Sequence, residues 1–323
     1  MPNAPIKRSE AAIIFGKAIE LTEQESPLPS VGTGSSPLSI QVELASIYQF
    51  YLHQPFTLLE SSISDLSAAL ESGKITSKQL DQQYLDRIEA YDDQGPALNA
   101  ILVVNPEALT LAEQLDLERQ EKGARGPLHG IPVILKDNYN TKDLPTTASS
   151  KTLEGFVPAE DAETVGKLRD AGAIILAKSN LHEMAMSGTT MSSLGGQTLN
   201  PYDLTRTPGG SSGGNGAAIA ANFAAAGTGT DTVNSVRSPA SANSLVGIRP
   251  TRGLVSLYGI VQVSSTQDAA GPITRNVADA ASYTDALDAS GLKGARIGVL
   301  TNLFGNDPIH QDVNTVMMQQ SRT

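Results

Sequence analysis

The segment that most constrains the fold runs from residue 206 to residue 239 (RTPGGSSGGNGAAIAANFAAAGTGTDTVNSVRSP). It begins with glycine and serine at residues 209–214, and glycine lets backbone approach backbone, or a ligand, closely. Residues 216–226 are almost all small and apolar, which predicts a tightly packed helix. A second turn of small residues lies around Ser235. A flexible linker would be polar throughout, so we expect a buried helix with a serine-bearing turn on each side.

The composition limits the classes of protein to which this chain can belong. Its 323 residues are enough for one large α/β domain, or two small ones, with a sizeable hydrophobic core. The formal net charge of −11 and the isoelectric point of about 4.8 disfavour nucleic-acid binding, because an acidic chain repels phosphate backbones. We attribute the acidity to solubility rather than to a specific cationic partner.

The chain contains no cysteine, which excludes disulfide bonds, thiolate catalysis and zinc–cysteine sites. Its first residues lack an apolar stretch long enough for a signal peptide. The longest run of small apolar residues, 217–226, is interrupted by Asn222 and is far shorter than a membrane span. We therefore expect a soluble cytoplasmic protein that binds neither membranes nor nucleic acid.

Two regions of the chain differ in character. Residues 25–39 are rich in proline, glycine and serine, and we expect residues 1–55 to form a peripheral arm and linker. Residues 56–323 are expected to form the main domain. Within it, residues 62–65 (SISD) and 76–79 (TSKQ) predict capping boxes that begin two helices, the first of which ends at a glycine.

The order of the remaining elements indicates an α/β fold. At residues 162–177 a helix leads through Gly172 into a short apolar strand, which is the second half of a crossover unit. We therefore expect a mixed, largely parallel sheet with helices on both faces. Further helices are predicted at residues 10–20, 40–52, 105–121, 181–187, 238–245 and 276–287, and after Pro308. Strands are predicted at residues 100–104, 132–136, 173–177 and 296–300.

Four motifs follow one another between about residue 57 and about residue 289. They are GPLHGIPVILKDN at 126–138, LPTTAS at 144–149, AKSN at 177–180, and GGSSGG at 209–214 followed by GTDTVNSVRSPAS. Together they resemble the amidase signature family of serine hydrolases. The resemblance implies that family's α/β fold and hydrolysis of carbon–nitrogen amide bonds in a small-molecule substrate, without a metal or a cofactor.

Amide hydrolysis needs an activated hydroxyl, a base, donors for the developing oxyanion and a proton source for the amine. The resemblance implies a Ser-Ser-Lys triad, with Ser235 as nucleophile, Ser211 as relay serine and Lys136 as base. In the family the relay serine follows a cis peptide bond, which here would join it to Gly210. The implied oxyanion hole consists of the backbone N–H groups of Thr232, Val233, Asn234 and Ser235, and the implied supporting residues are Asp231, Arg237 and Gly210.

Lys136 is in a suitable setting for a base. A lysine accepts a proton near neutral pH only if its pKa is lowered, and burial lowers it by disfavouring the cation. The apolar residues IPVIL at 131–135 lead directly to Lys136. Without the other motifs, this lysine would be interpreted as a solvated surface charge and the two serines as turn residues. Asp231 and Arg237 would be interpreted as a surface ion pair.

A histidine-dependent triad is the first alternative. The G-x-S-x-G pattern at residues 209–213 formally matches a nucleophile elbow, but that elbow follows a strand, and turn-rich residues 200–208 precede this one. We therefore disfavour an α/β-hydrolase site, since no recognisable catalytic context surrounds His53, His129, His182 or His310. We expect Asn180 and His182 to be structural and Lys178 to face solvent.

One position departs from the family pattern. Family members usually have Gly-Gly immediately before the nucleophile, where this chain has Val233 and Asn234. Any residue except proline supplies a backbone donor, but a β-branched residue is an outlier at positive φ, so Val233 should have a negative φ. The added bulk should narrow the acyl pocket and change the range of substrates more than the chemistry.

Two other functions stay open. The A subunit of a tRNA-dependent amidotransferase shares the triad, but it would need ammonia-accepting partner subunits, and the acidic charge and the Val-Asn pair disfavour it. Alternatively, the chain is an inactive, truncated amidase-like protein, and a homodimer is left open. Family members usually continue well past residue 323, so we expect a fragment, a truncated gene model or a short splice form.

Overall fold

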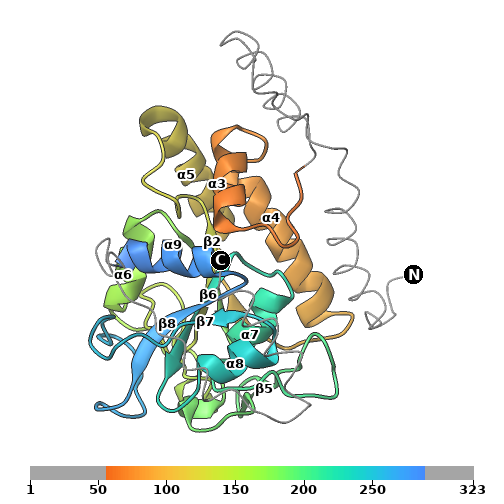
Figure 1. The fold of residues 1–323 in the computed structure, drawn as a ribbon, viewed down its shortest axis with the longest axis vertical. Coiled ribbons are helices and arrows are strands. Elements are labelled where there is room, and N and C mark those ends of the chain that lie inside the picture. Colours follow the sequence, from red (N-terminus) through yellow and green to blue (C-terminus); the bar gives the residue numbers. More distant parts are fainter. Residues whose placement is uncertain (1–55, 288–323) are drawn as a thin grey trace, which may run out of the picture.

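The computed structural model describes residues 56–287. The helices expected at residues 10–20, at 40–52 and after Pro308, and the strand at 296–300, lie outside this range. The centre of the described part is a six-stranded sheet in the order β1-β3-β2-β6-β8-β7 (Figure 1). Its strands are β1 (Ile101–Val104), β2 (Pro132–Lys136), β3 (Ile174–Ser179), β6 (Ala226–Asp231), β7 (Val246–Gly247) and β8 (Ala269–Thr274). The strands β4 (Met191–Ser192) and β5 (Gly196–Gln197) form a separate antiparallel pair.

The sheet is mixed, and its centre is parallel. β3, β2 and β6 run in parallel, whereas β1, β8 and β7 add antiparallel pairings on the two sides. The carboxyl ends of parallel strands meet at one edge of a sheet, where ligands bind in open α/β folds. At that edge lie Lys136, its register partner Ser179 and, at the end of β6, Asp231. The expected α/β fold is confirmed, and this edge is where the candidate site forms.

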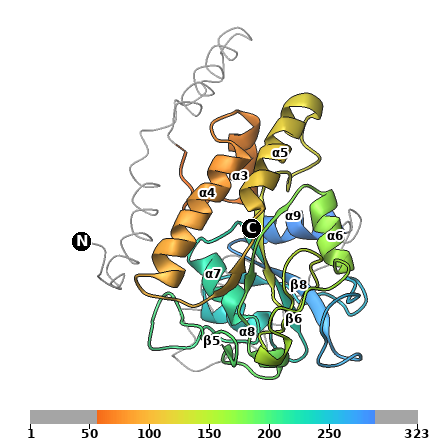
Figure 2. The ribbon, with the colours of Figure 1, turned by 180° about the vertical axis from the view of Figure 1, so that it is seen from behind.

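Helices cover both faces of the sheet. α7 packs on β2, β3, β6 and β8 beside α8, whereas α9 packs on β6, β7 and β8 beside α6, and Figures 1 and 2 show the same two pairs. The α-helices are α3 (Ile63–Glu71), α4 (Ser77–Ile88), α5 (Ala108–Lys122), α6 (Glu163–Asp170), α7 (Gly213–Ala220), α8 (Arg237–Ala242) and α9 (Val277–Leu287). Short turns of π- or 3₁₀-helix lie at Glu89–Asp93, Lys151–Leu153 and Glu183–Ala185, the last within the short helix expected at 181–187.

The N-terminal helices follow the sequence prediction closely. The hydroxyls of Ser62 and Thr76 accept hydrogen bonds from the N–H groups three residues ahead, and both capping boxes are complete. α4 packs against α5, and Figure 1 shows α3, α4 and α5 together at one end of the molecule. The predicted start of α5 at residue 105 is wrong, because Asn105 Oδ1 accepts the N–H of Glu107 and holds a turn before the helix.

The helix predicted at residues 216–226 is only half correct. α7 ends at Ala220, because Asn222 has a φ of 57° and turns the chain out of the helix. Ala226 then begins β6, which the sequence analysis missed. A Cβ on Gly227 of that strand would lie 3.1 Å from Ile219 Cγ1, so glycine there lets α7 lie close to the sheet.

The hydrophobic core lies between the sheet and its covering helices. β2 and β3 are buried along their whole length, as strands covered on both faces should be. The largest buried apolar and aromatic side chains include Tyr84, Tyr139, Phe223 and Tyr283. Within residues 56–287, no helix combines the length and the apolar character that crossing a membrane would require.

Candidate active site

The amine of Lys136 is fully buried at the end of β2, with a relative exposure of 0%. Its Nζ lies 2.8 Å from Ser211 Oγ and 2.8 Å from Thr230 Oγ1, and the Thr230 carbonyl is 3.5 Å away. Burial lowers the pKa of Lys136 to about 7, although Asp231 and Asp268 act in the opposite direction. This amine is therefore suited to exchange a proton with Ser211 near neutral pH.

Ser211 lies in a tightly packed loop between β5 and α7. The peptide bond from Gly210 to Ser211 is cis, as the family resemblance implies. Thr190 Oγ1 donates to the Gly209 carbonyl at 2.7 Å, and the N–H of His182 donates to the Ser211 carbonyl at 3.0 Å. A Cβ on Gly210 would lie 2.8 Å from the carbonyl carbon of Gly188, so this loop has no room for a side chain there.

Ser235 lies in the turn between β6 and α8, and it is 8% exposed. Its carbonyl accepts the N–H of Ser212 at 3.2 Å, which places the turn beside Ser211. Within residues 56–287, neither the Ser235 hydroxyl nor the backbone N–H groups of Val233, Asn234 and Ser235 have a hydrogen-bond partner. The turn therefore presents a hydroxyl and several free backbone donors together.

Val233 projects from this turn into solvent, with 72% of its surface exposed. It is absent from the residues with positive φ, so the expectation of a negative φ is confirmed. The β-branched side chain therefore fits a position where family members usually have glycine. Its exposed side chain lies in the same turn as Ser235.

The carboxylate of Asp231 holds the turn together through hydrogen bonds and ion pairs. Asp231 is fully buried, and its Oδ2 accepts the N–H of Val236 at 3.0 Å and Arg237 Nε at 3.2 Å. Arg249 Nε lies 3.3 Å from Oδ1, a partner that the sequence analysis missed. Arg237 also binds the Val233 carbonyl. Asp231 and Arg237 therefore hold the shape of the turn and are more than a surface ion pair.

Two further contacts lie beside this turn and at the end of β6. Thr232 Oγ1 donates to Asp268 Oδ1 at 2.6 Å, and Asn138 Nδ2 lies 3.2 Å from Thr230 Oγ1. Neither contact was predicted from the sequence, and no role was expected for Asp268, Asn138 or Thr230. Asn138 is the last residue of the GPLHGIPVILKDN motif, so the sequence did point to this residue. Its contact with Thr230 on β6, however, is seen only in the folded structure.

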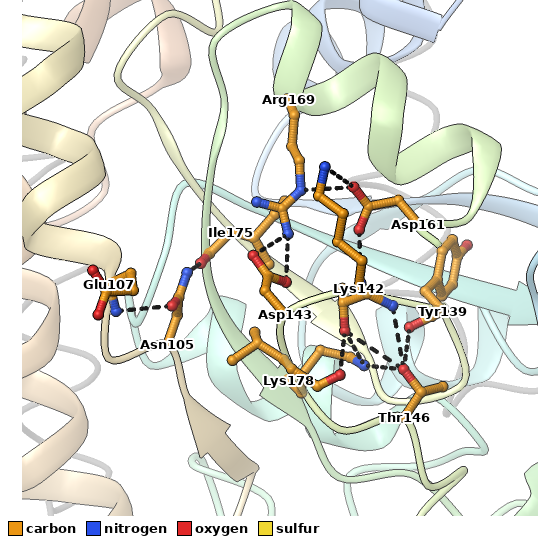
Figure 3. A network of polar contacts seen from close by, with 12 residues as sticks. Asn105, Glu107, Tyr139, Lys142, Asp143, Thr146, Asp161, Arg169, Ile175 and Lys178 are labelled. Atoms are coloured by element: carbon orange, nitrogen blue, oxygen red, sulfur yellow. Dashed lines mark hydrogen bonds and ion pairs between the residues drawn. The ribbon is translucent and has the colours of Figure 1, made fainter. Parts of the chain in front are cut away.

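The prediction that Lys178 faces solvent is wrong. Lys178 on β3 is fully buried, and its Nζ lies 3.1 Å from Asp137 Oδ1. It also donates to the Pro145 carbonyl at 2.9 Å. A third contact, to Thr146 Oγ1 at 3.0 Å, is visible in Figure 3. Burial lowers the pKa of Lys178, while Asp137 acts in the opposite direction. The lysine is buried because a loop that the sequence leaves unassigned folds over it.

Ion pairs at the surface hold that loop in place. Arg169 on α6 lies 2.7 Å from Asp143 and 3.2 Å from Asp161, and Lys142 lies 3.8 Å from Asp161 (Figure 3). Asp143 belongs to the loop that covers Lys178, and Arg169 belongs to α6, the helix that precedes β3. This ion pair therefore connects the covering loop to the helix before the strand that carries Lys178. Within residues 56–287, neither Lys178 nor its partner Asp137 contacts Ser211, so we assign the residues around Lys178 a structural role.

Asn180 and His182 bind neighbouring loops. Asn180 is fully buried and donates to Thr198 Oγ1 at 3.0 Å, and its Oδ1 accepts the N–H of Leu181 at 2.9 Å. His182 Nδ1 lies 3.2 Å from Thr189 Oγ1, and burial lowers the pKa of its imidazole. These contacts fit the structural roles expected for both residues.

A surface hollow of about 320 Å³ opens next to the glycine–serine loop. Thr207 lines it and binds both the Thr189 carbonyl and the N–H of Gly209. The other lining residues are Thr189, Met191, Gln197, Leu199, Leu204, Thr205 and Arg206. None of Lys136, Ser211 and Ser235 lines this hollow, so we do not place the chemistry there.

Comparison with known proteins identifies the class. The family model described as Amidase matches residues 79–293, and the chain therefore belongs to the amidase family. The peptide amidase of Stenotrophomonas maltophilia has a similar structure, with a TM-score of 0.70, 45% sequence identity, and coverage of 76% of this chain and 52% of that one. A solved fatty acid amide hydrolase gives a TM-score of 0.69 at 28% identity, covering 77% of this chain and 44% of that one.

Among curated proteins, the chain is similar to A subunits of glutamyl-tRNA(Gln) amidotransferases. The subunit of Prochlorococcus marinus (strain NATL2A) is 38% identical over 282 residues, which cover 80% of this chain and 57% of the relative. That of Thermobifida fusca (strain YX) is 48% identical over 225 residues, covering 69% of this chain and 45% of the relative. The chain thus spans about half the length of these relatives.

Proposed function

We propose that this chain hydrolyses the carbon–nitrogen bond of a small linear amide through a Ser-Ser-Lys triad and a covalent acyl-enzyme. The main support is the buried contact of 2.8 Å between Lys136 Nζ and Ser211 Oγ, where the pKa of the lysine is lowered to about 7. Similarity to the peptide amidase of Stenotrophomonas maltophilia supports the same class of substrate. The functions of Lys136 as base, Ser211 as relay and Ser235 as nucleophile are part of this proposal.

The first half of the reaction forms the acyl-enzyme. Neutral Lys136 accepts the proton of the Ser211 hydroxyl, and Ser211 takes the proton of the Ser235 hydroxyl. Ser235 Oγ attacks the amide carbon, and the carbonyl oxygen becomes an oxyanion. When the carbon–nitrogen bond breaks, the proton returns through Ser211 to the leaving amine, which departs neutral. Relay contacts often tighten only with substrate bound, so the free Ser235 hydroxyl is compatible with this step.

The second half consumes water and restores the enzyme. A water molecule gives its proton to the same relay and attacks the ester carbon on Ser235. Collapse of the second oxyanion breaks the ester bond, and the proton returns to Ser235 Oγ, so that a carboxylic acid leaves. The backbone N–H groups of Thr232, Val233, Asn234 and Ser235 form the oxyanion hole of this proposal, because preorganised donors that face a developing charge stabilise it. Its support is that the N–H groups of Val233, Asn234 and Ser235 have no hydrogen-bond partner within residues 56–287.

The A subunit of a tRNA-dependent amidotransferase is the second candidate. Its support is the similarity to amidotransferase A subunits, which reaches 48% identity for Thermobifida fusca. Such a subunit would release ammonia from glutamine for partner subunits. Incubating the purified chain alone with glutamine and with C-terminal peptide amides separates the two candidates. Release of ammonia from peptide amides without any partner favours the amidase, and release from glutamine that depends on added partner subunits favours the amidotransferase.

Labelling with a serine-reactive fluorophosphonate probe tests the triad. We expect Ser235→Ala to abolish labelling, and Ser211→Ala and Lys136→Ala to slow it by about 10²- to 10⁴-fold. Ser77→Ala is the matched control, because Ser77 is also fully buried but lies on α4, outside the candidate site. Circular dichroism of each variant verifies folding.

Three outcomes decide between the proposals. The triad is supported if folded Ser235→Ala takes up no probe, Ser211→Ala takes it up slowly and Ser77→Ala takes it up as wild type does. Unchanged labelling of Ser235→Ala overturns the assignment of the nucleophile. A folded wild-type chain that takes up no probe favours an inactive, amidase-like protein.

A further inference from the structure

The hydroxyl of Thr230 lies between the Lys136 amine and the side-chain amide of Asn138. Its Oγ1 is 2.8 Å from Lys136 Nζ and 3.2 Å from Asn138 Nδ2. All three residues are buried, and Asn138 is only 1% exposed. Water therefore screens this chain of contacts poorly, and a dipole placed there acts strongly on the amine.

The backbone of Val261 determines which end of the Asn138 amide faces Thr230. Asn138 Nδ2 donates to the Val261 carbonyl at 2.9 Å, and the backbone carbonyl of Asn138 accepts the N–H of Val261 at 2.8 Å. A flipped amide would place Oδ1 against the Val261 carbonyl, where two acceptors repel each other. The NH₂ group therefore faces both Val261 and Thr230, and the positive end of the amide dipole lies toward Lys136.

The charged groups around Lys136 act against this dipole. Asp231 and Asp268 both raise the pKa of the amine. Asp231 is paired with Arg237 and Arg249, which reduces its effect. Asp268 accepts hydrogen bonds from Thr232 and from backbone N–H groups, at 2.6 Å and 2.8 Å for the two shortest.

The other two charged groups near the end of β2, Asp137 and Lys178, compensate each other. Asp137, which follows Lys136 directly, is paired with Lys178 at 3.1 Å. Asn138 is thus a neutral group with a partial positive charge directed toward the amine, whereas Asp231 and Asp268 favour the ammonium form. The Asn138 side chain reaches the Lys136 amine only through Thr230, so replacing this amide changes the electrostatic environment of the amine without removing a hydrogen-bond partner of Lys136.

We propose, on the basis of the function proposed above, that Asn138 is a positioning residue for Lys136. By donating to Thr230 Oγ1, it holds the hydroxyl against which the amine rests and keeps the amine in its neutral, proton-accepting form. Asn138 touches neither Ser211 nor Ser235, so it acts only through Thr230 and Lys136. The Lys136 amine of an Asn138 variant should therefore hold its proton to a higher pH.

The variant Asn138→Asp has nearly the same shape but places a carboxylate where the NH₂ group was. A negative charge within about 6 Å favours the ammonium, so the pKa of Lys136 should rise by about one unit or more. Asn138→Leu removes the dipole without adding charge, and a smaller rise is expected. Asn138→Leu also tests the proposal if Asn138→Asp fails to fold. In Thr230→Val, where the connecting hydroxyl is absent, adding Asn138→Leu should produce little further change.

The experiment is a pH titration of the protein with ¹³C-labelled lysine side chains, followed by NMR. The resonance that disappears in Lys136→Met identifies the Lys136 amine. A higher titration midpoint in both Asn138 variants supports the proposal, and an unchanged midpoint in the folded variants overturns it. Asn105→Asp is the matched control, since Asn105 is also buried and donates to a strand carbonyl at 2.7 Å, and it should leave the midpoint unchanged.

Fluorophosphonate labelling of the same samples separates this inference from the proposed function. A raised midpoint together with slower labelling at neutral pH supports both. A raised midpoint in a chain whose wild type takes up no probe supports the role of Asn138 toward Lys136 and overturns the amidase function. Normal labelling that depends on Ser235, with an unchanged midpoint in the Asn138 variants, preserves the amidase function and overturns the role of Asn138.

Discussion

The amine of Lys136 lies 2.8 Å from the hydroxyl oxygen of Ser211, although the two residues are 75 positions apart in the chain. β2 brings the lysine to the carboxyl edge of the sheet, and the loop before α7 brings the serine to the same point. Both residues are fully buried, so no bulk water competes for the contact. The fold thus pairs a lysine of lowered pKa with a hydroxyl that can give it a proton.

This pairing predicts the pH dependence of the reaction. Only the neutral amine accepts a proton, and its fraction increases as the pH rises through the pKa of Lys136, at about 7. We therefore expect the labelling rate of Ser235 to rise about tenfold per pH unit below this value and to level off above it. Rates measured between about pH 5 and about pH 9 provide the test. The residual rate of Lys136→Ala should lack this rise, and a flat wild-type profile would contradict the assignment of the base.

The buried pair of Lys178 and Asp137 predicts a large loss of stability when one partner is removed. In Lys178→Met the Asp137 carboxylate stays buried without its cation, which costs about 3–5 kcal/mol in free energy of unfolding. Urea denaturation measures this loss. Lys167→Met is the matched control, because Lys167 is half-exposed and pairs with Glu163 at the surface, so its loss should be under about 0.5 kcal/mol. Equal losses in the two variants would refute the structural importance of the buried pair.

Asp81 on α4 predicts a gain of stability on substitution. Within residues 56–287 both of its carboxylate oxygens are buried without a hydrogen-bond partner, and burial raises the pKa of Asp81 well above its usual value. The folded chain then holds a proton that the unfolded chain loses at lower pH. Wild-type stability therefore falls as the pH rises from the usual pKa of the carboxyl toward its folded value.

The variant Asp81→Leu removes this cost. Its Tm at pH 7 should exceed that of wild type by about 2–4 °C, equivalent to about 1 kcal/mol, and the difference should shrink in acid. Asp86→Leu is the control, since Asp86 is exposed on the same helix and binds Gln82 at 2.7 Å. Thermal unfolding at several pH values measures both, and a difference that does not depend on pH would contradict the protonation of Asp81.

Val233 predicts a restricted range of acyl groups. Its exposed side chain stands beside Ser235, so Val233→Gly should increase kcat/KM for bulky acyl amides relative to small ones. The same change should cost about 0.5–1 kcal/mol in stability, because glycine gives the unfolded chain more freedom. Val157→Gly, at an exposed loop position away from the site, should leave the ratio of kcat/KM values unchanged. If the ratio also stays constant in Val233→Gly, this valine does not line the substrate path.

Local signals in the sequence predicted much of the fold. The capping boxes at Ser62 and Thr76 locate two helices because their hydrogen bonds form within four residues. The apolar runs before Lys136 and before Lys178 locate β2 and β3, because strands buried on both faces require such runs. β6 and β8 were missed, since AGTGTD and AAGPIT contain few bulky apolar residues and carry no alternating pattern.

The candidate site was predictable only in part. The family motifs placed Lys136, Ser211, Ser235 and the turn around Asp231 in one site, and their catalytic roles remain predictions. Arg249, Asn138 and Asp268 could not be predicted, because their contacts join segments that are distant in the sequence and no periodic pattern records such contacts.

The sequence by itself determined the family, the helix caps and the apolar strands, because each depends on neighbouring residues or on a motif. Only the tertiary structure determined the contacts of the two lysines that follow apolar runs. Lys136 lies against β6 and Ser211, whereas Lys178 lies under the loop around Thr146 and pairs with Asp137. Strand neighbours and covering loops are set by packing between distant segments, and that packing makes one buried lysine a candidate base and the other a structural cation.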